Sequence, residues 1–151
     1  MLTPLSRYTA QMLSALLAVT GAITHHDSAY TVLTADGHPA FSFRIEAITA
    51  FGELVRVSSR PDRRELSSLS PEVLLLRHGA AFYPIHLAFG RPPIRYESAG
   101  LSPDRTLLNI HDLAQQRDVA LFAEHWLHLL KCSLPDSPTY QITTAARSNV
   151  A

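Results

Sequence analysis

The sequence has little of several residue types, and each scarcity excludes something. Its single cysteine, Cys132, excludes an intramolecular disulfide and any zinc site built from several thiolates of one chain. Its single lysine, Lys131, leaves a basic surface made almost entirely of arginine. Because 13 basic residues balance 13 acidic ones, no net charge attracts nucleic acid or an anionic membrane. We therefore expect no nucleic-acid partner, and the scarcity of cysteine favours a reducing, cytoplasmic location.

Long apolar runs are also missing. No segment reaches the roughly 20 uninterrupted apolar residues of a membrane span. The run from Met12 to Ile23 has the length of a signal peptide, but Arg7 is the only positive charge before it. Thr3 as an N-cap, Pro4 at the first helical position and Gly21 at the end indicate a helix instead. We expect a cytoplasmic amphipathic helix, with a signal peptide as the alternative.

The clearest positive feature is the segment from Asp112 to Lys131, which contains the only tryptophan. Asp112 suits an N-cap, and Gln115 follows three residues later, as in a capping box. Apolar side chains then recur at helical spacing, at Val119, Phe122, Ala123, Trp126, Leu127 and Leu130. This pattern predicts a helix that closes the core.

Between the two helices the pattern changes to alternation, which is typical of strands. The turn pairs Asp36-Gly37 and His78-Gly79 predict tight hairpins. The predicted strands are Tyr30–Thr34, Phe41–Ala47, Leu54–Val57, Glu72–Arg77, Ala81–Leu87 and a short sixth strand, Ile94–Glu97. We therefore predict one α+β domain over residues 1–132, an antiparallel sheet of five or six strands with an N-terminal and a C-terminal helix packed on it. Residues 133–151, rich in Ser, Thr, Pro and Ala, are predicted to be a disordered tail.

The sequence holds few signs of catalysis. Among its eight histidines, His25 and His26 precede Asp27, and His125 and His128 are three residues apart, but no HExxH motif fixes a metal geometry. No GxSxG element occurs, and the six glycines are too scattered for a phosphate-binding loop. The main arginine cluster, Arg56, Arg60, Arg63 and Arg64, is diluted by two carboxylates. We predict no catalytic, cofactor-binding or metal-binding residue, and the alternative is a small enzyme or metal-binding protein that uses histidines.

A partner-binding surface is predicted on the strand Ala81–Leu87. Pro84 has no backbone N–H to donate, so this strand is expected at a sheet edge or at a bulge. Its apolar side chains exceed what an isolated edge can expose, which predicts contact with a partner or with a second copy of the chain through Phe82, Tyr83, Ile85 and Leu87. The alternative is that a helix or the segment 91–97 covers this edge within one chain.

Two stretches of the second half resemble the YqiB-like family of short bacterial proteins, whose function is not established. They are SLSPEVLLLRHGA at Ser68–Ala80 and LFAEHWLHLLKC at Leu121–Cys132. The resemblance implies a strand entering a histidine-containing turn and a helix with an apolar Trp-Leu pair. Gly79 stands where the family has an aspartate, and the family's Tyr-Pro-Asn element has no counterpart here, so no functional residue is carried over.

By architecture alone, the predicted chain is similar to the small chaperones of type III secretion, which dimerise and hold extended segments of partner proteins. That analogy and the lack of a catalytic set lead to one prediction of function. The chain is expected to be a non-enzymatic protein-binding or regulatory module, chaperone-like in its mode of action and able to form a homodimer.

Overall fold

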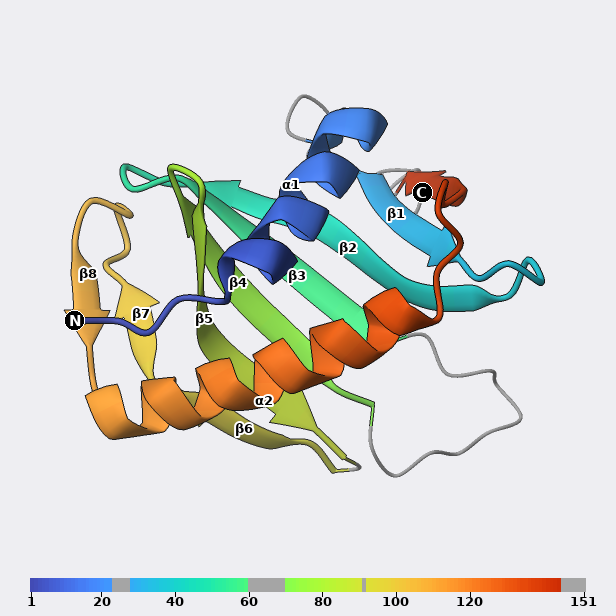
Figure 1. Cartoon of the computed structure of the whole chain (residues 1–151). Coiled ribbons are helices and arrows are strands. Elements are labelled where there is room, and N and C mark those ends of the chain that lie inside the picture. Colours follow the sequence, from blue (N-terminus) through green and yellow to red (C-terminus); the bar gives the residue numbers. More distant parts are fainter. Residues whose placement is uncertain (23–27, 60–69, 91, 145–151) are drawn as a thin grey trace.

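A two-layer α+β arrangement is seen in the computed structural model, which describes residues 1–22, 28–59, 70–90 and 92–144. One layer is a seven-stranded antiparallel sheet in the order β6-β5-β4-β3-β2-β1-β9, and both helices lie on one of its faces (Figure 1). The helices are α1 (Arg7–Thr20) and α2 (Leu113–Cys132). The strands are β1 (Ser28–Leu33), β2 (Pro39–Ile48), β3 (Glu53–Ser59), β4 (Glu72–His78), β5 (Ala81–Phe89), β6 (Ile94–Glu97), β7 (Ala99–Leu101), β8 (Leu108–Ile110) and β9 (Tyr140–Thr144). The predicted fold class is confirmed, with a larger sheet than expected.

The six predicted strands correspond to β1–β6, which run as a meander. The β4–β5 hairpin turns at Gly79 and Ala80, and Gly79 has the positive φ of 62° that this tight turn requires. The register between β4 and β5 shifts between Leu74 and Leu75, opposite Pro84. A bulge at the proline is therefore confirmed.

The prediction that this strand lies at a sheet edge is wrong. β5 lies between β4 and β6, and residues 86–89 pair with β6. Beyond that pairing, the backbone N–H of Leu5 donates to the carbonyl oxygen of Phe82 at 2.8 Å, and that of Ser98 donates to Ile85 at 3.0 Å. The proposed contact residues Phe82, Ile85 and Leu87 are buried, and Tyr83 is half-buried. Other parts of the same chain thus cover the apolar surface that a partner was predicted to cover.

The predicted disordered tail is also corrected in part. Residues 140–144 form β9, which pairs antiparallel with β1. Tyr140 packs its ring at an edge-to-face angle against the buried Tyr30, with centroids 6.0 Å apart. Five residues are too few to show a sustained apolar period, and the segment 133–151 that contains them is rich in Ser, Thr, Pro and Ala, so the sequence did not predict this strand. Residues 145–151 lie outside the described part of the chain.

Each helix begins at a polar cap. The N-cap of α1 is Ser6, whose hydroxyl accepts from the N–H of Thr9 at 3.2 Å, so the expected cap at Thr3 is wrong by one turn. Asp112 caps α2 as predicted, accepting from the N–H of Gln115 at 3.0 Å. Neither described helix is long and apolar enough to cross a membrane.

The main core lies between the helices and the sheet. The buried stripe of α2 consists of Gln116, Val119, Ala120, Ala123 and Leu127. Trp126 lies at the margin of this stripe, partly buried, rather than at its centre. Sheet residues such as Phe41, Val57 and Val73 face the stripe from the central strands. A smaller apolar cluster lies on the other face of the sheet, where β7 and β8 pack against Leu54, Leu76 and Ile85.

Candidate functional site

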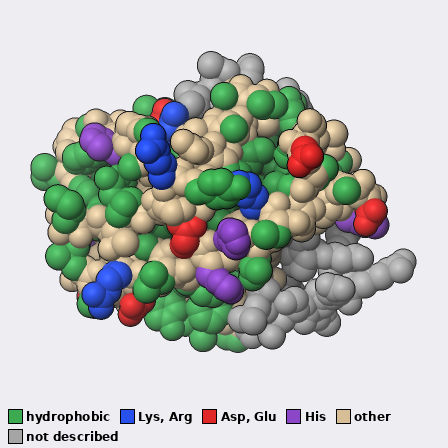
Figure 2. Space-filling view, in the orientation of Figure 1, with side chains coloured by type: hydrophobic (Ala, Val, Ile, Leu, Met, Phe, Trp, Pro, Cys, Tyr) green, Lys and Arg blue, Asp and Glu red, His purple; other side chains and the backbone are tan. Residues whose placement is uncertain are grey.

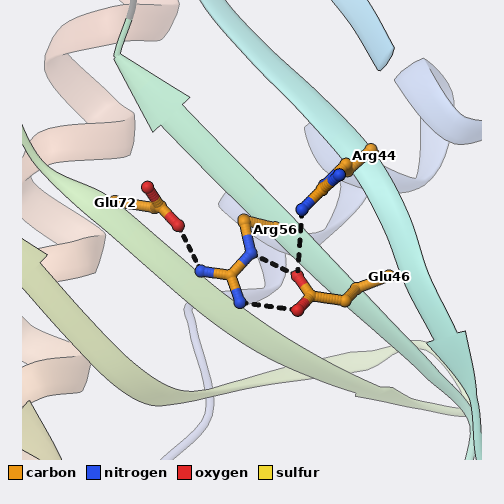
Figure 3. Close-up of polar contacts among 4 residues, drawn as sticks. All are labelled: Arg44, Glu46, Arg56 and Glu72. Atoms are coloured by element: carbon orange, nitrogen blue, oxygen red, sulfur yellow. Dashed lines mark hydrogen bonds and ion pairs between the residues drawn. The ribbon is translucent and has the colours of Figure 1, made fainter. Parts of the chain in front are cut away.

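Two sites stand out among the described residues, one on each face of the sheet. The first is a charged cluster on the face away from the helices, centred on Arg56 of β3 (Figure 3). The Arg56 guanidinium donates to both oxygens of Glu46 on β2, with Nη2 to Oε1 at 2.7 Å, and its Nη1 reaches Glu72 on β4. Arg44, the cross-strand neighbour of Arg56, lies 4.0 Å from the same Glu46 carboxylate. Three neighbouring strands are thus joined by one guanidinium.

The charges of this cluster compensate one another. The hydrogen bond from Arg56 lowers the pKa of the Glu46 carboxyl, and the reciprocal bond raises the pKa of Arg56. A hollow of about 250 Å³ beside the cluster adds His86, Arg95 and Glu97, so that arginines and glutamates are again balanced. One ring nitrogen of His86 lies 2.7 Å from the carbonyl oxygen of Ala99. Arg44, Arg56, Glu46 and Glu72 thus form a solvent-facing ion-pair network, whereas Arg95 and Glu97 form no ion pair with any described residue.

The second site is an apolar pocket on the helix side of the sheet, with a volume of about 570 Å³. Its first wall is one face of α1, its second is the C-terminal end of α2 with the connection to β9, and its floor includes Val32 of β1. The lining residues are Met12, Ala15, Leu16, Val19, Thr20, Val32, Lys131, Leu134, Pro135, Asp136, Ser137, Pro138, Thr139 and Tyr140. We refer to these residues as the α1–β9 pocket.

Local sequence explains why the α1–β9 pocket forms. The chain leaves α2 through a tight turn in which Leu134 donates its N–H to the carbonyl oxygen of Lys131 at 3.0 Å. Pro135 and Pro138 then prevent the helix from continuing. Thr139 accepts from the N–H of Leu33 at 2.9 Å, which attaches the end of this connection to β1. The connection is therefore held away from α1, and the space between them is the pocket.

Lys131 lies at the boundary between this pocket and the solvent. It belongs to the last turn of α2, and its ammonium nitrogen lies 3.3 Å from the centroid of the Tyr8 ring on α1. Tyr8 precedes the lining residue Met12 by one helical turn, so the two lie on the same side of α1. Figure 2 shows the helix-covered face of the molecule, where charged side chains are scattered among apolar ones. A cation beside an apolar pocket is thus a local feature of this face.

The described histidines do not form a metal site. His125 and His128 are exposed on α2. Within the described ranges, no group of three or more His, Cys, Asp or Glu side chains could hold a metal ion. His25, His26 and Asp27 lie outside those ranges, as do Arg60, Arg63 and Arg64 of the arginine cluster, of which only Arg56 has been described above.

Comparisons of the chain with protein-family models, with curated proteins and with solved structures found no match. The resemblance to the YqiB-like family is therefore neither supported nor refuted. The site must be judged from the geometry of this chain alone.

The α1–β9 pocket was missed from the sequence because its walls are 100 residues or more apart along the chain. The apolar residues of α1 are as expected for a helix that packs on a sheet, and those after α2 were assigned to a disordered tail. One signal could have indicated the site. Lys131 is the only lysine of the chain, at the junction of a helix with a proline-rich segment.

Proposed function

We propose that this chain is a non-enzymatic binding module and that the α1–β9 pocket is its binding site. The observation that carries the proposal is the combination of volume and lining. A volume of about 570 Å³ falls within the range typical of small-molecule sites, roughly 300 to 1,000 Å³. The lining is mostly apolar with a few polar groups at its margin, as in sites where burial supplies affinity and polar contacts supply orientation.

The walls of the pocket are attached to the fold independently of any ligand. α1 buries Leu13, Leu16 and Leu17 in the main core. The opposite wall continues into β9, which pairs with β1 over five residues. Because both walls are preformed, little conformational entropy would be lost on binding.

The test is binding of the neutral fluorescent probe N-phenyl-1-naphthylamine. We expect saturable binding of one probe per chain. Ala15 is an exposed alanine of α1 that lines the pocket, so Ala15→Phe should fill the space and weaken binding at least tenfold. Ala18 is equally exposed on α1 but lies outside the lining, and Ala18→Phe should bind as the original chain does. Absence of saturable binding, or equal effects of the two substitutions, would overturn the proposal.

A protein partner, including a second copy of the chain, is the second candidate. The observation that favours it is β9, which pairs only with β1 among the described strands and exposes 57% of Ile142. An edge strand of this kind can accept another strand. If two copies associate there, sedimentation should show a dimer that Ile142→Lys abolishes, whereas Arg95→Lys on the opposite edge strand should leave it intact. A chain that stays monomeric at high concentration contradicts the homodimer.

The proposal keeps two expectations from the sequence, a cytoplasmic location and the lack of a catalytic role. The first is supported by a lone thiol, Cys132, which is exposed and unpaired with any other cysteine. The second is supported by the mutual neutralisation of the charges around Arg56. An enzyme or metal-binding protein is the alternative, and stoichiometric metal in the purified protein would favour it.

A further inference from the structure

The ligand class of the α1–β9 pocket follows from Lys131, and this inference rests on the function proposed above. Lys131 is a half-buried residue of the lining, and its ammonium nitrogen lies 3.3 Å from the centroid of the Tyr8 ring, which is outside the lining. Long cationic side chains can cover apolar surface with their aliphatic stem and keep the charged end in water. The same side chain therefore offers apolar contact inside the pocket and a positive charge at its margin.

The charge of Lys131 is not compensated by a carboxylate. Lys131 forms no ion pair with any residue that the structure describes, in contrast to Arg44, Arg56 and Arg77. It shares this property with the described residues Arg7, Arg95, Arg105 and Arg117 but is the cation that lines the pocket. The contact with Tyr8 is a cation–π interaction, which leaves N–H groups of the ammonium free to donate. An anionic group at the margin could accept from Lys131 without displacing an existing ion pair.

The position of Lys131 in the last turn of α2 explains part of its placement, because a cation there interacts favourably with the helix dipole. The cation–π contact with Tyr8 explains why the ammonium extends across to α1. Asp136 also lines the pocket and is exposed, so we expect a bound anion to lie against Lys131 and away from the Asp136 carboxylate. The lining is thus largely apolar, with Lys131 as its one cationic side chain and Asp136 as its one carboxylate.

We propose that the α1–β9 pocket binds an amphipathic monoanion, with its apolar chain or ring in the pocket and its carboxylate or similar group on Lys131. Simple fatty acids and aromatic acids belong to this class. The charge adds orientation and selectivity, whereas burial of the apolar part supplies most of the affinity.

The experiment compares decanoate with decanol, two ten-carbon chains that differ in the charge of the head group, as competitors of N-phenyl-1-naphthylamine. At low salt we expect decanoate to bind about two- to fivefold more tightly than decanol, which is the upper part of the range of a partly exposed ion pair. The ratio should fall towards one as sodium chloride is raised from 0.05 to 0.5 M, because salt screens an exposed charge.

Three variants separate charge from structure. Lys131→Met should reduce the ratio to about one without weakening decanol, and Lys131→Arg should keep the preference. Tyr8→Leu removes the cation–π contact but retains the ammonium, so it should also keep the preference. Equal binding of decanoate and decanol by the original chain, or a preference that survives Lys131→Met, overturns the inference while leaving the binding module in place. Failure of the neutral probe and of both competitors to bind overturns the inference and the proposed function together.

Discussion

Substitution of Gln116 by methionine is expected to lower stability more than any conservative change elsewhere on α2. Gln116 is fully buried, and its side chain joins three segments of the chain. Its Oε1 accepts from the N–H of Thr3 at 2.6 Å, and its Nε2 donates to the carbonyl oxygens of Thr3 at 2.9 Å and of Pro84 at 2.8 Å. Methionine has a similar volume and flexibility, so the substitution removes these hydrogen bonds without adding a large cavity.

The expected magnitude follows from the three contacts. At a net contribution of about 0.5 to 1.5 kcal/mol each, the three hydrogen bonds total roughly 1.5 to 4.5 kcal/mol. The carbonyl oxygen of Pro84 would stay buried without this donor, which raises the cost, whereas the groups of Thr3 can move into water, which lowers it. We expect the free energy of unfolding to fall by about 3 kcal/mol. For a chain of this length, that corresponds to a melting temperature lower by roughly 6 to 12 °C.

The assay is urea unfolding followed by the fluorescence of Trp126, with Gln115→Met as the matched control. Gln115 is only half-buried, and its hydrogen bond to Asp112 uses the backbone N–H, which methionine keeps. The control should therefore change stability by less than about 0.5 kcal/mol. Deletion of residues 1–4 should reduce the cost of Gln116→Met to roughly 1 to 2 kcal/mol, because only the bond to Pro84 remains. Equal stabilities of the two methionine variants, or a cost unchanged by the deletion, would refute the reasoning.

Three other predictions concern the rest of the fold. Gly52→Ala would place a Cβ 1.8 Å from the carbonyl oxygen of Arg77, so we expect a loss above roughly 2 kcal/mol in urea unfolding, whereas Gly37→Ala has no atom within 4 Å and should cost less. Deleting residues 140–151 removes β9 and should lower the melting temperature, whereas deleting only residues 145–151 leaves β9 intact; equal effects would contradict the role of this strand. Burial raises the pKa of Glu124, but hydrogen bonds from Thr9 and Ser6 outweigh it, so the net pKa is lowered. The ionised carboxylate therefore stabilises the fold above about pH 4.3 and loses this contribution as the pH falls. The difference in unfolding free energy between the original chain and Glu124→Gln should thus shrink between pH 7 and pH 3.5, and a constant difference would contradict this assignment.

The secondary structure was largely determined by the sequence itself. Alternation at Phe41, Phe43 and Ile45 predicted β2, and the turn glycines Gly37 and Gly79 predicted two hairpins, because these signals act over a few neighbouring residues. The cap of α2 at Asp112 is equally local. Such features need no knowledge of what the element packs against.

Only the tertiary structure decided which strands form the edges and where a ligand could bind. Pro84 suggested that β5 is an edge strand, but β6 pairs with residues 86–89, and the N–H groups of Leu5 and Ser98 donate to the carbonyl oxygens of Phe82 and Ile85. β9 was hidden because a strand of five residues is stabilised by its pairing with β1 and not by its own composition. The α1–β9 pocket depends on where the chain leaves α2 relative to α1. Local periodicity fixes the type of each element, whereas edges and pockets arise from contacts between residues far apart in sequence, and a single sequence does not specify those contacts directly.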